Sequence, residues 1–167
     1  MAAPRCSTPP TPMRSTIASS GTTSGSSRVL SLPIRRGGRA RVVTKCGMAR
    51  PGGAWRADGR ARSIAADCEK SLEALGGRPI DLLLLHAPDP RVPFATSVRA
   101  LAALVDRGWV RSIGVSNVNR SQLAEALELA PLTAVEVALG AGDDQALRGG
   151  VVSLALERGL WVLAHAP

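Results

Sequence analysis

Residues 81–90 read DLLLLHAPDP, a run of four leucines followed by a histidine and two prolines. A strand over Asp81–Leu85 is apolar on both faces, which is typical of a strand that is covered on both sides of a parallel sheet. Because parallel strands need long crossover connections, usually helices, this run predicts a protein of the α/β class. The chain on both sides of it shows the alternation that such a sheet requires.

Four further short apolar runs predict strands of the same sheet. They are Val42–Thr44, Ser112–Val115, Ala134–Val137 and Leu160–Ala164. Between the runs, apolar residues recur every three or four positions, as on one face of a helix. The clearest of these helical patterns is Ile64, Cys68, Leu72 and Leu75, and the last one is Leu147, Val151 and Leu154. We therefore expect about five parallel strands and four helices in strict alternation.

Capping residues mark the ends of the expected helices. Asn119, with Gln122 three positions later, predicts a capping box at the start of one helix. Gly76-Gly77, Gly108 and Gly159 follow helical patterns and are candidates for the residue after the helix end. Rossmann-like sheets and (β/α)8 barrels both begin with this alternation. No GxGxxG follows the first expected strand, which disfavours the dinucleotide-binding open sheet.

The length of the chain fits a single domain, whereas the distribution of charge divides it into two parts. It has 167 residues, 45% of them hydrophobic, which is enough for one domain with a buried core. Residues 1–57 carry ten basic residues and no acidic one, while the rest carries 11 basic and 13 acidic residues. Residues 1–40 form a basic segment that is rich in Ser and Thr and of low complexity, and we expect it to be disordered. Its composition also fits an organelle transit peptide or a wrongly assigned start.

Several partners are disfavoured by what the sequence lacks. Residues 1–40 bring no aromatic platform and no zinc-ligand spacing, so we expect no nucleic-acid partner. No run of 18 apolar residues is present, so we expect no membrane partner. The three cysteines have no CxxC spacing, which predicts reduced thiols and no metal site. The expected location is cytoplasmic, or an organelle if residues 1–40 are a transit peptide.

Polar residues end several of the expected strands. Lys45 ends the first strand, His86 the second, and Ser116 with Asn117 the third, while Glu136 lies within the fourth. In a barrel of parallel strands the reacting centre lies at this face. The sequence therefore predicts an active site built from these five residues.

Four stretches resemble successive strands of the aldo-keto reductase family. They are VVTK (42–45), DLLLLHAPDP (81–90), GWVRSIGVSN (108–117) and AVEV (134–137). The resemblance covers roughly residues 41–167 and implies an α/β fold of the (β/α)8 TIM-barrel type, here incomplete. It further implies NADPH as cofactor and a small aldehyde or ketone as substrate.

The resemblance also implies a role for each candidate residue. Lys45 and His86 match the active-site lysine and histidine, and Ser116 with Asn117 matches the pair that holds the nicotinamide carboxamide. Glu136 stands where the family usually has a glutamine that contacts the same amide. A carboxylate can accept from that amide but cannot donate to it.

In the family that the chain resembles, the tyrosine and the aspartate of the catalytic tetrad lie upstream of the lysine strand. Neither has a counterpart here, because the chain contains no Tyr and its first acidic residue, Asp58, comes after Lys45. We therefore expect an NAD(P)H-dependent reductase that is inactive or nearly so in this form. The alternatives are a non-catalytic barrel remnant that serves as a binding or regulatory module, and a gene fragment without function of its own. Exposed strand edges of a partial barrel also predict self-association.

Overall fold

A computed structural model describes residues 40–140 and 142–165, so the expectations for residues 1–39 lie outside the described part. Five strands form one parallel sheet in the order β1-β4-β5-β6-β7. These strands are β1 (Val43–Cys46), β4 (Leu82–Leu85), β5 (Ile113–Ser116), β6 (Leu132–Ala138) and β7 (Trp161–His165). The prediction of an α/β fold with five parallel strands is confirmed, with strand ends displaced by one or two residues.

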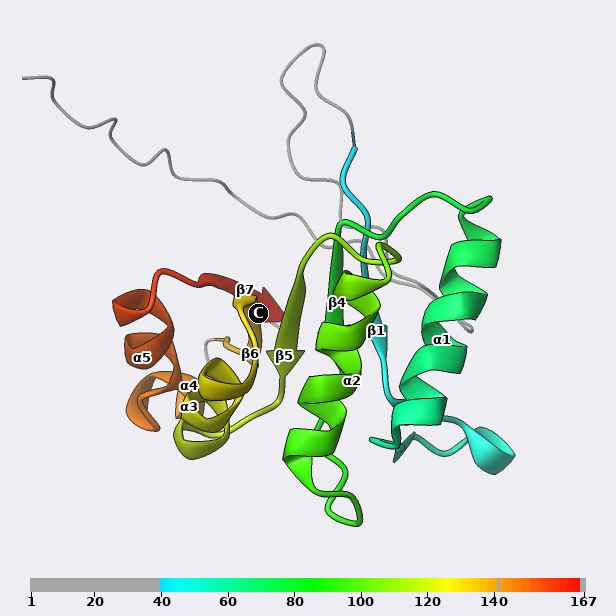
Figure 1. The fold of residues 1–167 in the computed structure, drawn as a ribbon. Coiled ribbons are helices and arrows are strands. Elements are labelled where there is room, and N and C mark those ends of the chain that lie inside the picture. Colours follow the sequence, from blue (N-terminus) through cyan, green and yellow to red (C-terminus); the bar gives the residue numbers. More distant parts are fainter. Residues whose placement is uncertain (1–39, 141, 166–167) are drawn as a thin grey trace, which may run out of the picture.

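Helices follow the strands and cover one side of the sheet (Figure 1). The helices are α1 (Ala61–Ala74), α2 (Phe94–Asp106), α3 (Arg120–Leu129), α4 (Gln145–Arg148) and α5 (Val151–Glu157). The strand order follows the chain order without reversal. A doubly wound sheet reverses its order at a switch point, and this sheet does not. The topology is that of a segment of a (β/α) barrel.

The hydrophobic core lies between the helices and the outer face of the sheet. Side chains of alternate strand positions, including Leu83, Leu85 and Val115, pack there against Ile64 of α1 and Leu101 of α2, and all five are fully buried. Burial of each such side chain stabilises the fold by roughly 1.5–3 kcal/mol. The opposite, inner face carries a different set of side chains and holds the candidate site.

Two local features differ from the expectation. The single last helix predicted from Leu147, Val151 and Leu154 is two helices, because Gly150 has a φ of 72° and interrupts the helix between α4 and α5. A small hairpin between β1 and α1 was not predicted at all. It consists of β2 (Met48–Ala49) and β3 (Arg56–Ala57), joined through the short 3-10 helix η1 (Pro51–Gly53).

The predicted helix ends are confirmed. Asn119 and Gln122 form a reciprocal capping box at the start of α3, with hydrogen bonds of 2.8 and 3.0 Å. Gly76, Gly77, Gly108 and Gly159 all have positive φ after their helices. Of the helices within residues 40–140 and 142–165, none combines the length and the apolar character needed to cross a bilayer.

Candidate active site

The five predicted site residues lie at the carboxyl edge of the parallel sheet. Lys45 is in β1, Ser116 ends β5, Glu136 lies in β6, and His86 and Asn117 come directly after β4 and β5. Ser116 and Glu136 are register partners on neighbouring strands, so their side chains project to the same face. The structure thus brings together residues that are up to 91 positions apart in the sequence.

Lys45 and Glu136 form an ion pair across the inner face of the sheet. Lys45 Nζ lies 2.5 Å from Glu136 Oε1, and the side chains are 27% and 8% exposed. Two strands, β4 and β5, stand between β1 and β6. In a flat sheet, three spacings of about 4.8 Å would separate the two backbones. The contact therefore shows that the sheet curves and that both side chains lie on its concave face.

The inner face between this pair is closely packed at Gly114. A Cβ added there would lie 2.4 Å from the carbonyl oxygen of Ala134 and 2.6 Å from Leu84 Cδ2. Leu84 and Ala134 are the register partners of Gly114 and are both fully buried. Glycine is required at this position because no side chain fits between the neighbouring strands.

Ser116 presents a buried hydroxyl that has no partner among the described residues. The residue is fully buried, and its Oγ makes no hydrogen bond within residues 40–140 and 142–165. Buried polar atoms are normally satisfied, because leaving one unpaired costs roughly 1–3 kcal/mol. The unsatisfied hydroxyl on the Glu136 face of the sheet is therefore a candidate contact for a polar group of a ligand.

Asn117 joins the ends of two strands. Its φ is 56°, a left-handed conformation that asparagine adopts more readily than most residues. Its Nδ2 donates to the backbone oxygen of His86 at 2.8 Å, and its backbone N–H donates to the oxygen of Glu136 at 3.2 Å. The side-chain Oδ1 accepts no hydrogen bond from a described residue and can therefore serve as an acceptor.

His86 lies beside an aromatic residue from the hairpin. The rings of His86 and Trp55 have centroids 5.7 Å apart at 54°. The Arg50 guanidinium stands 4.2 Å above the Trp55 ring. At the level of sequence Trp55 could equally line a substrate mouth or be an incidental surface residue. The structure places it against His86, and the pairing of β2 with β3 is what brings it there.

The two cysteines of the described part are packed thiols. Cys46 follows Lys45 in β1 and points to the opposite, outer face, where it is 2% exposed. Burial, with a smaller contribution from the charge of Asp67, raises its pKa well above the usual value. Burial raises the pKa of Cys68 to about 11. Neither thiol is therefore suited to act as a nucleophile at neutral pH.

The described residues contain no group of three or more His, Cys, Asp or Glu side chains that could hold a metal ion. The five predicted site residues place a lysine, a carboxylate, a hydroxyl, an amide and an imidazole at the carboxyl edge of the sheet. This set can bind and polarise a carbonyl or an amide.

Comparison with known proteins agrees with the barrel-type fold. Residues 34–146 match the profile of the Aldo/keto reductase family. A 6-dehydroglucose reductase of Agrobacterium fabrum is 40% identical over 82 residues, which cover 46% of this chain and 28% of that protein. An uncharacterized oxidoreductase of Schizosaccharomyces pombe is 31% identical over 96 residues, covering 57% and 31%.

Solved structures show the same fold. A glycerol dehydrogenase from Gluconobacter oxydans superimposes with a TM-score of 0.70 at 31% identity, over 75% of this chain and 39% of that one. A thermostable aldo-keto reductase in complex with the inhibitor epalrestat gives 0.68 at 27% identity, over 80% and 46%. The chain thus spans about a third of the length of these curated relatives and less than half of these structures.

Proposed function

This chain belongs to the aldo/keto reductase family, and we propose that it carries the carbonyl-polarising and nicotinamide-holding residues of an NAD(P)H-dependent reductase of aldehydes or ketones. The observation that carries the proposal is the unpartnered, fully buried hydroxyl of Ser116 on the face where Lys45 meets Glu136. NADPH is the proposed cofactor, and a small carbonyl compound is the proposed substrate.

The residues present fit the carboxamide of a nicotinamide. Ser116 Oγ is a buried donor without an acceptor in the described part of the chain. Asn117 donates through Nδ2 to the backbone oxygen of His86, which leaves its Oδ1 as an acceptor for a ligand. Glu136 has one oxygen on Lys45, and its other oxygen, which bonds to no described residue, can accept from an amide NH2. Together they offer one donor and two acceptors, which match a carboxamide.

A bound nicotinamide would supply hydride to the carbonyl carbon, and the alkoxide oxygen would take its proton from water. Lys45 and His86 then polarise the carbonyl, because the ammonium and the imidazole can both donate to an oxygen that develops negative charge. Glu136 is proposed as a positioning residue, since its carboxylate fixes Lys45 Nζ on the inner face. Trp55 limits the space beside the His86 ring.

The 167-residue chain contains no tyrosine to act as proton donor. Loss of a general acid lowers turnover by about 10²–10⁴-fold. We therefore propose that this chain alone does not oxidise NADPH with common aldehydes above background. The lack of a tyrosine favours a second candidate function, in which the same face binds a nucleotide without turnover.

Titration with NADPH, followed by saturation-transfer NMR on the nicotinamide protons, tests the proposal. We expect a dissociation constant weaker than about 100 μM. Ser116→Ala should weaken binding further while leaving stability unchanged or raised, because it removes an unsatisfied polar atom. The exposed Ser121→Ala is the matched control. Undiminished binding by Ser116→Ala would refute the carboxamide role.

Turnover separates the two candidate functions. Saturable NADPH binding without turnover supports the binding module. Measurable reduction of an aldehyde that disappears in Lys45→Met supports the reductase. Rates of order 1–10³ per second would contradict the expected low activity.

A further inference from the structure

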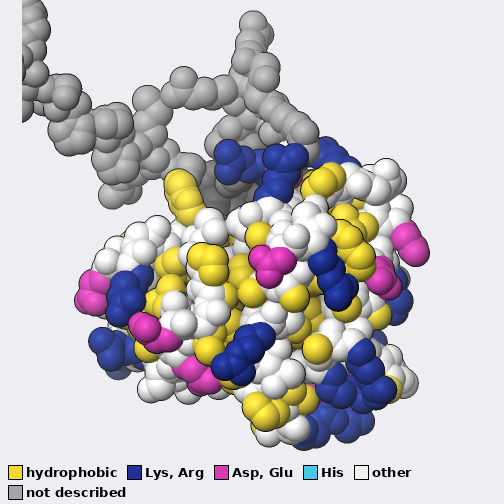
Figure 2. Space-filling model, viewed as in Figure 1, with side chains coloured by type: hydrophobic (Ala, Val, Ile, Leu, Met, Phe, Trp, Pro, Cys, Tyr) yellow, Lys and Arg dark blue, Asp and Glu magenta, His cyan; other side chains and the backbone are white. Residues whose placement is uncertain are grey.

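A separate cavity lies beside the candidate active site, outside the residues assigned above. Its volume is about 560 Å³, and it is lined by the β2–β3 hairpin, the start of α1 and the loop after β4. Neither His86 nor Trp55 is among its lining residues. Three of the lining residues are arginines: Arg56, Arg60 and Arg91. Figure 2 shows Lys and Arg side chains gathered at this end of the molecule.

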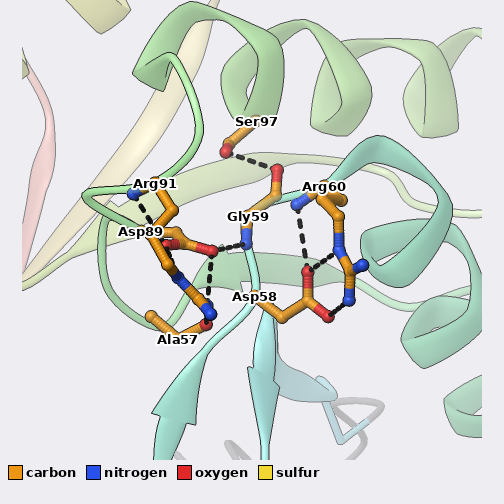
Figure 3. A network of polar contacts seen from close by, with 7 residues as sticks. All are labelled: Ala57, Asp58, Gly59, Arg60, Asp89, Arg91 and Ser97. Atoms are coloured by element: carbon orange, nitrogen blue, oxygen red, sulfur yellow. Dashed lines mark hydrogen bonds and ion pairs between the residues drawn. The ribbon is translucent and has the colours of Figure 1, made fainter.

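Two of the three arginines are held in fixed orientations by aspartates. Arg91 donates through Nε to Asp89 Oδ1 at 2.9 Å and through Nη2 to Asp89 Oδ2 at 3.0 Å. Arg60 makes the same two-pronged pair with Asp58, with its Nε 2.7 Å from Oδ1. Figure 3 shows these pairs on either side of Gly59. Such paired guanidinium groups lose little further freedom when a ligand binds.

The backbone between the two pairs is also fixed. Gly59 N–H donates to Asp89 Oδ2 at 3.2 Å, and the buried Ser97 donates to the Gly59 oxygen at 2.7 Å. A Cβ at Gly59 would lie 2.6 Å from Ser97 Oγ. Asp89 itself has a side chain that is only 2% exposed. The segment before α1 and the loop after β4 are therefore held together in the absence of a ligand.

Each arginine keeps donors that no described residue uses. Nη1 of Arg60 and Nη1 of Arg91 have no acceptor within the described part of the chain, and Arg56 makes no ion pair or hydrogen bond through its side chain there. The cavity wall carries three arginines and two aspartates, Asp58 and Asp89, so that its net charge is +1. The unused donors belong to Arg56 of β3, to Arg60 four residues later at the start of α1, and to Arg91 in the loop after β4.

We propose that this cavity binds the phosphate group of a phosphorylated small molecule. Guanidinium groups are well suited to phosphate oxygens, because they donate paired, charge-assisted hydrogen bonds. Donors from three arginine side chains match an oxyanion with three terminal oxygens better than a planar carboxylate with two. A volume of about 560 Å³ exceeds what phosphate alone needs and lies in the usual range for small-molecule sites.

Arg56→Ala is the variant that tests the site without disturbing the fold, because its exposed side chain makes no bond within the described residues. The probes are inorganic phosphate and glycerol 3-phosphate, titrated by calorimetry against the full chain. Wild type should bind both, with glycerol 3-phosphate at least as tight. Arg56→Ala should weaken both by about tenfold, the equivalent of one charge-assisted contact.

The matched control is Arg99→Ala, an exposed arginine of α2 that does not line the cavity. It removes the same charge and should leave both affinities unchanged. The proposal is overturned if wild type shows no saturable binding up to about 10 mM, a range that covers weak metabolite sites. It is also overturned if Arg99→Ala weakens binding as much as Arg56→Ala, or if acetate binds as tightly as phosphate.

Discussion

Lys45 Nζ and Glu136 Oε1 are joined at 2.5 Å across the concave face of the sheet. The family resemblance implies a lysine paired with an aspartate and a glutamine at the position of Glu136. Here the carboxylate beside the lysine comes from β6. Glu136 thereby neutralises a charge that would otherwise stand unpaired on a partly buried face, and this makes the pair a structural as well as a proposed functional unit.

A double-mutant cycle measures how strongly this pair stabilises the fold. Lys45→Met and Glu136→Gln should each lower the free energy of unfolding by about 1–3 kcal/mol, because Glu136 is 8% exposed and would lose or weaken its partner. The double variant should cost less than the sum, with a coupling of about 1–2 kcal/mol in urea denaturation. Strict additivity of the two single effects would show that the ion pair contributes nothing.

Gly114→Ala should destabilise the protein by about 1–3 kcal/mol or more, because the added methyl group overlaps the Ala134 oxygen and the Leu84 side chain. The backbone oxygen lies at 2.4 Å and cannot move without breaking the pairing of β5 with β6. Gly142→Ala is the control, since a Cβ there meets nothing within 4 Å. Equal thermal midpoints for the two variants would contradict this account.

Local signals predicted much of the fold. The apolar runs and helical periodicities located all five parallel strands and the helices α1, α2 and α3, and they predicted one helix where α4 and α5 lie. Asn119 with Gln122 located the start of α3. These features depend on residues close in sequence. The break at Gly150 was missed because the apolar spacing of Leu147, Val151 and Leu154 continues through it, although Gly149-Gly150 was a visible signal.

The candidate site was predictable as a set of residues but not as a set of contacts. Parallel strands bring their carboxyl ends to one edge, so Lys45, His86 and Ser116 could be grouped from the sequence. The bond between Lys45 and Glu136 depends on sheet curvature, which no local pattern encodes. The arginine-lined cavity depends on a hairpin of two-residue strands, which are too short to show alternation.

Acid should weaken the contact between the loop after β4, which carries Asp89, and the segment at Gly59 before α1, both of which border the arginine-lined cavity. Hydrogen bonds from the Arg91 side chain, and then from the backbone N–H groups of Arg91 and Gly59, lower the pKa of Asp89 from 3.8 to about 2. A carboxyl with a lowered pKa stabilises the folded state above its unfolded pKa, and that contribution is lost as the pH falls through the folded pKa. The loss should therefore occur between about pH 4 and pH 2.

Thermal unfolding of wild type and Asp89→Asn at a series of pH values measures this contribution. At pH 7 the variant should be less stable, because a neutral amide replaces the acceptor of four hydrogen bonds. The two proteins should converge as the pH falls from 4 to 2. Asp106→Asn, at an exposed aspartate of α2, should change the stability at pH 7 by no more than about 0.5 kcal/mol. A constant difference between wild type and Asp89→Asn at every pH would argue against a role of Asp89 ionisation.

The edge strand β7 should make the 167-residue chain self-associate. Within the described residues β7 pairs only with β6, and its sequence, WVLAH, contains no proline and no lysine or arginine. Trp161 on this strand is 71% exposed. An apolar edge with unpaired backbone groups recruits other chains, whereas an inward-facing or edge charge discourages them. The charge of residues 41–167 opposes association only weakly, because they carry 15 basic and 13 acidic residues.

Size-exclusion chromatography with light scattering over a range of concentrations tests this expectation. The apparent mass of wild type should rise with concentration, and Trp161→Lys should shift the distribution toward monomer because it removes the exposed ring and places a charge on the edge. Leu156→Lys is the matched control, since Leu156 is 65% exposed on the helix α5 and is not part of the edge strand. If Leu156→Lys restored the monomer as well as Trp161→Lys did, association would proceed through general surface hydrophobicity. A wild-type monomer at every concentration would mean that the β7 edge is covered in solution.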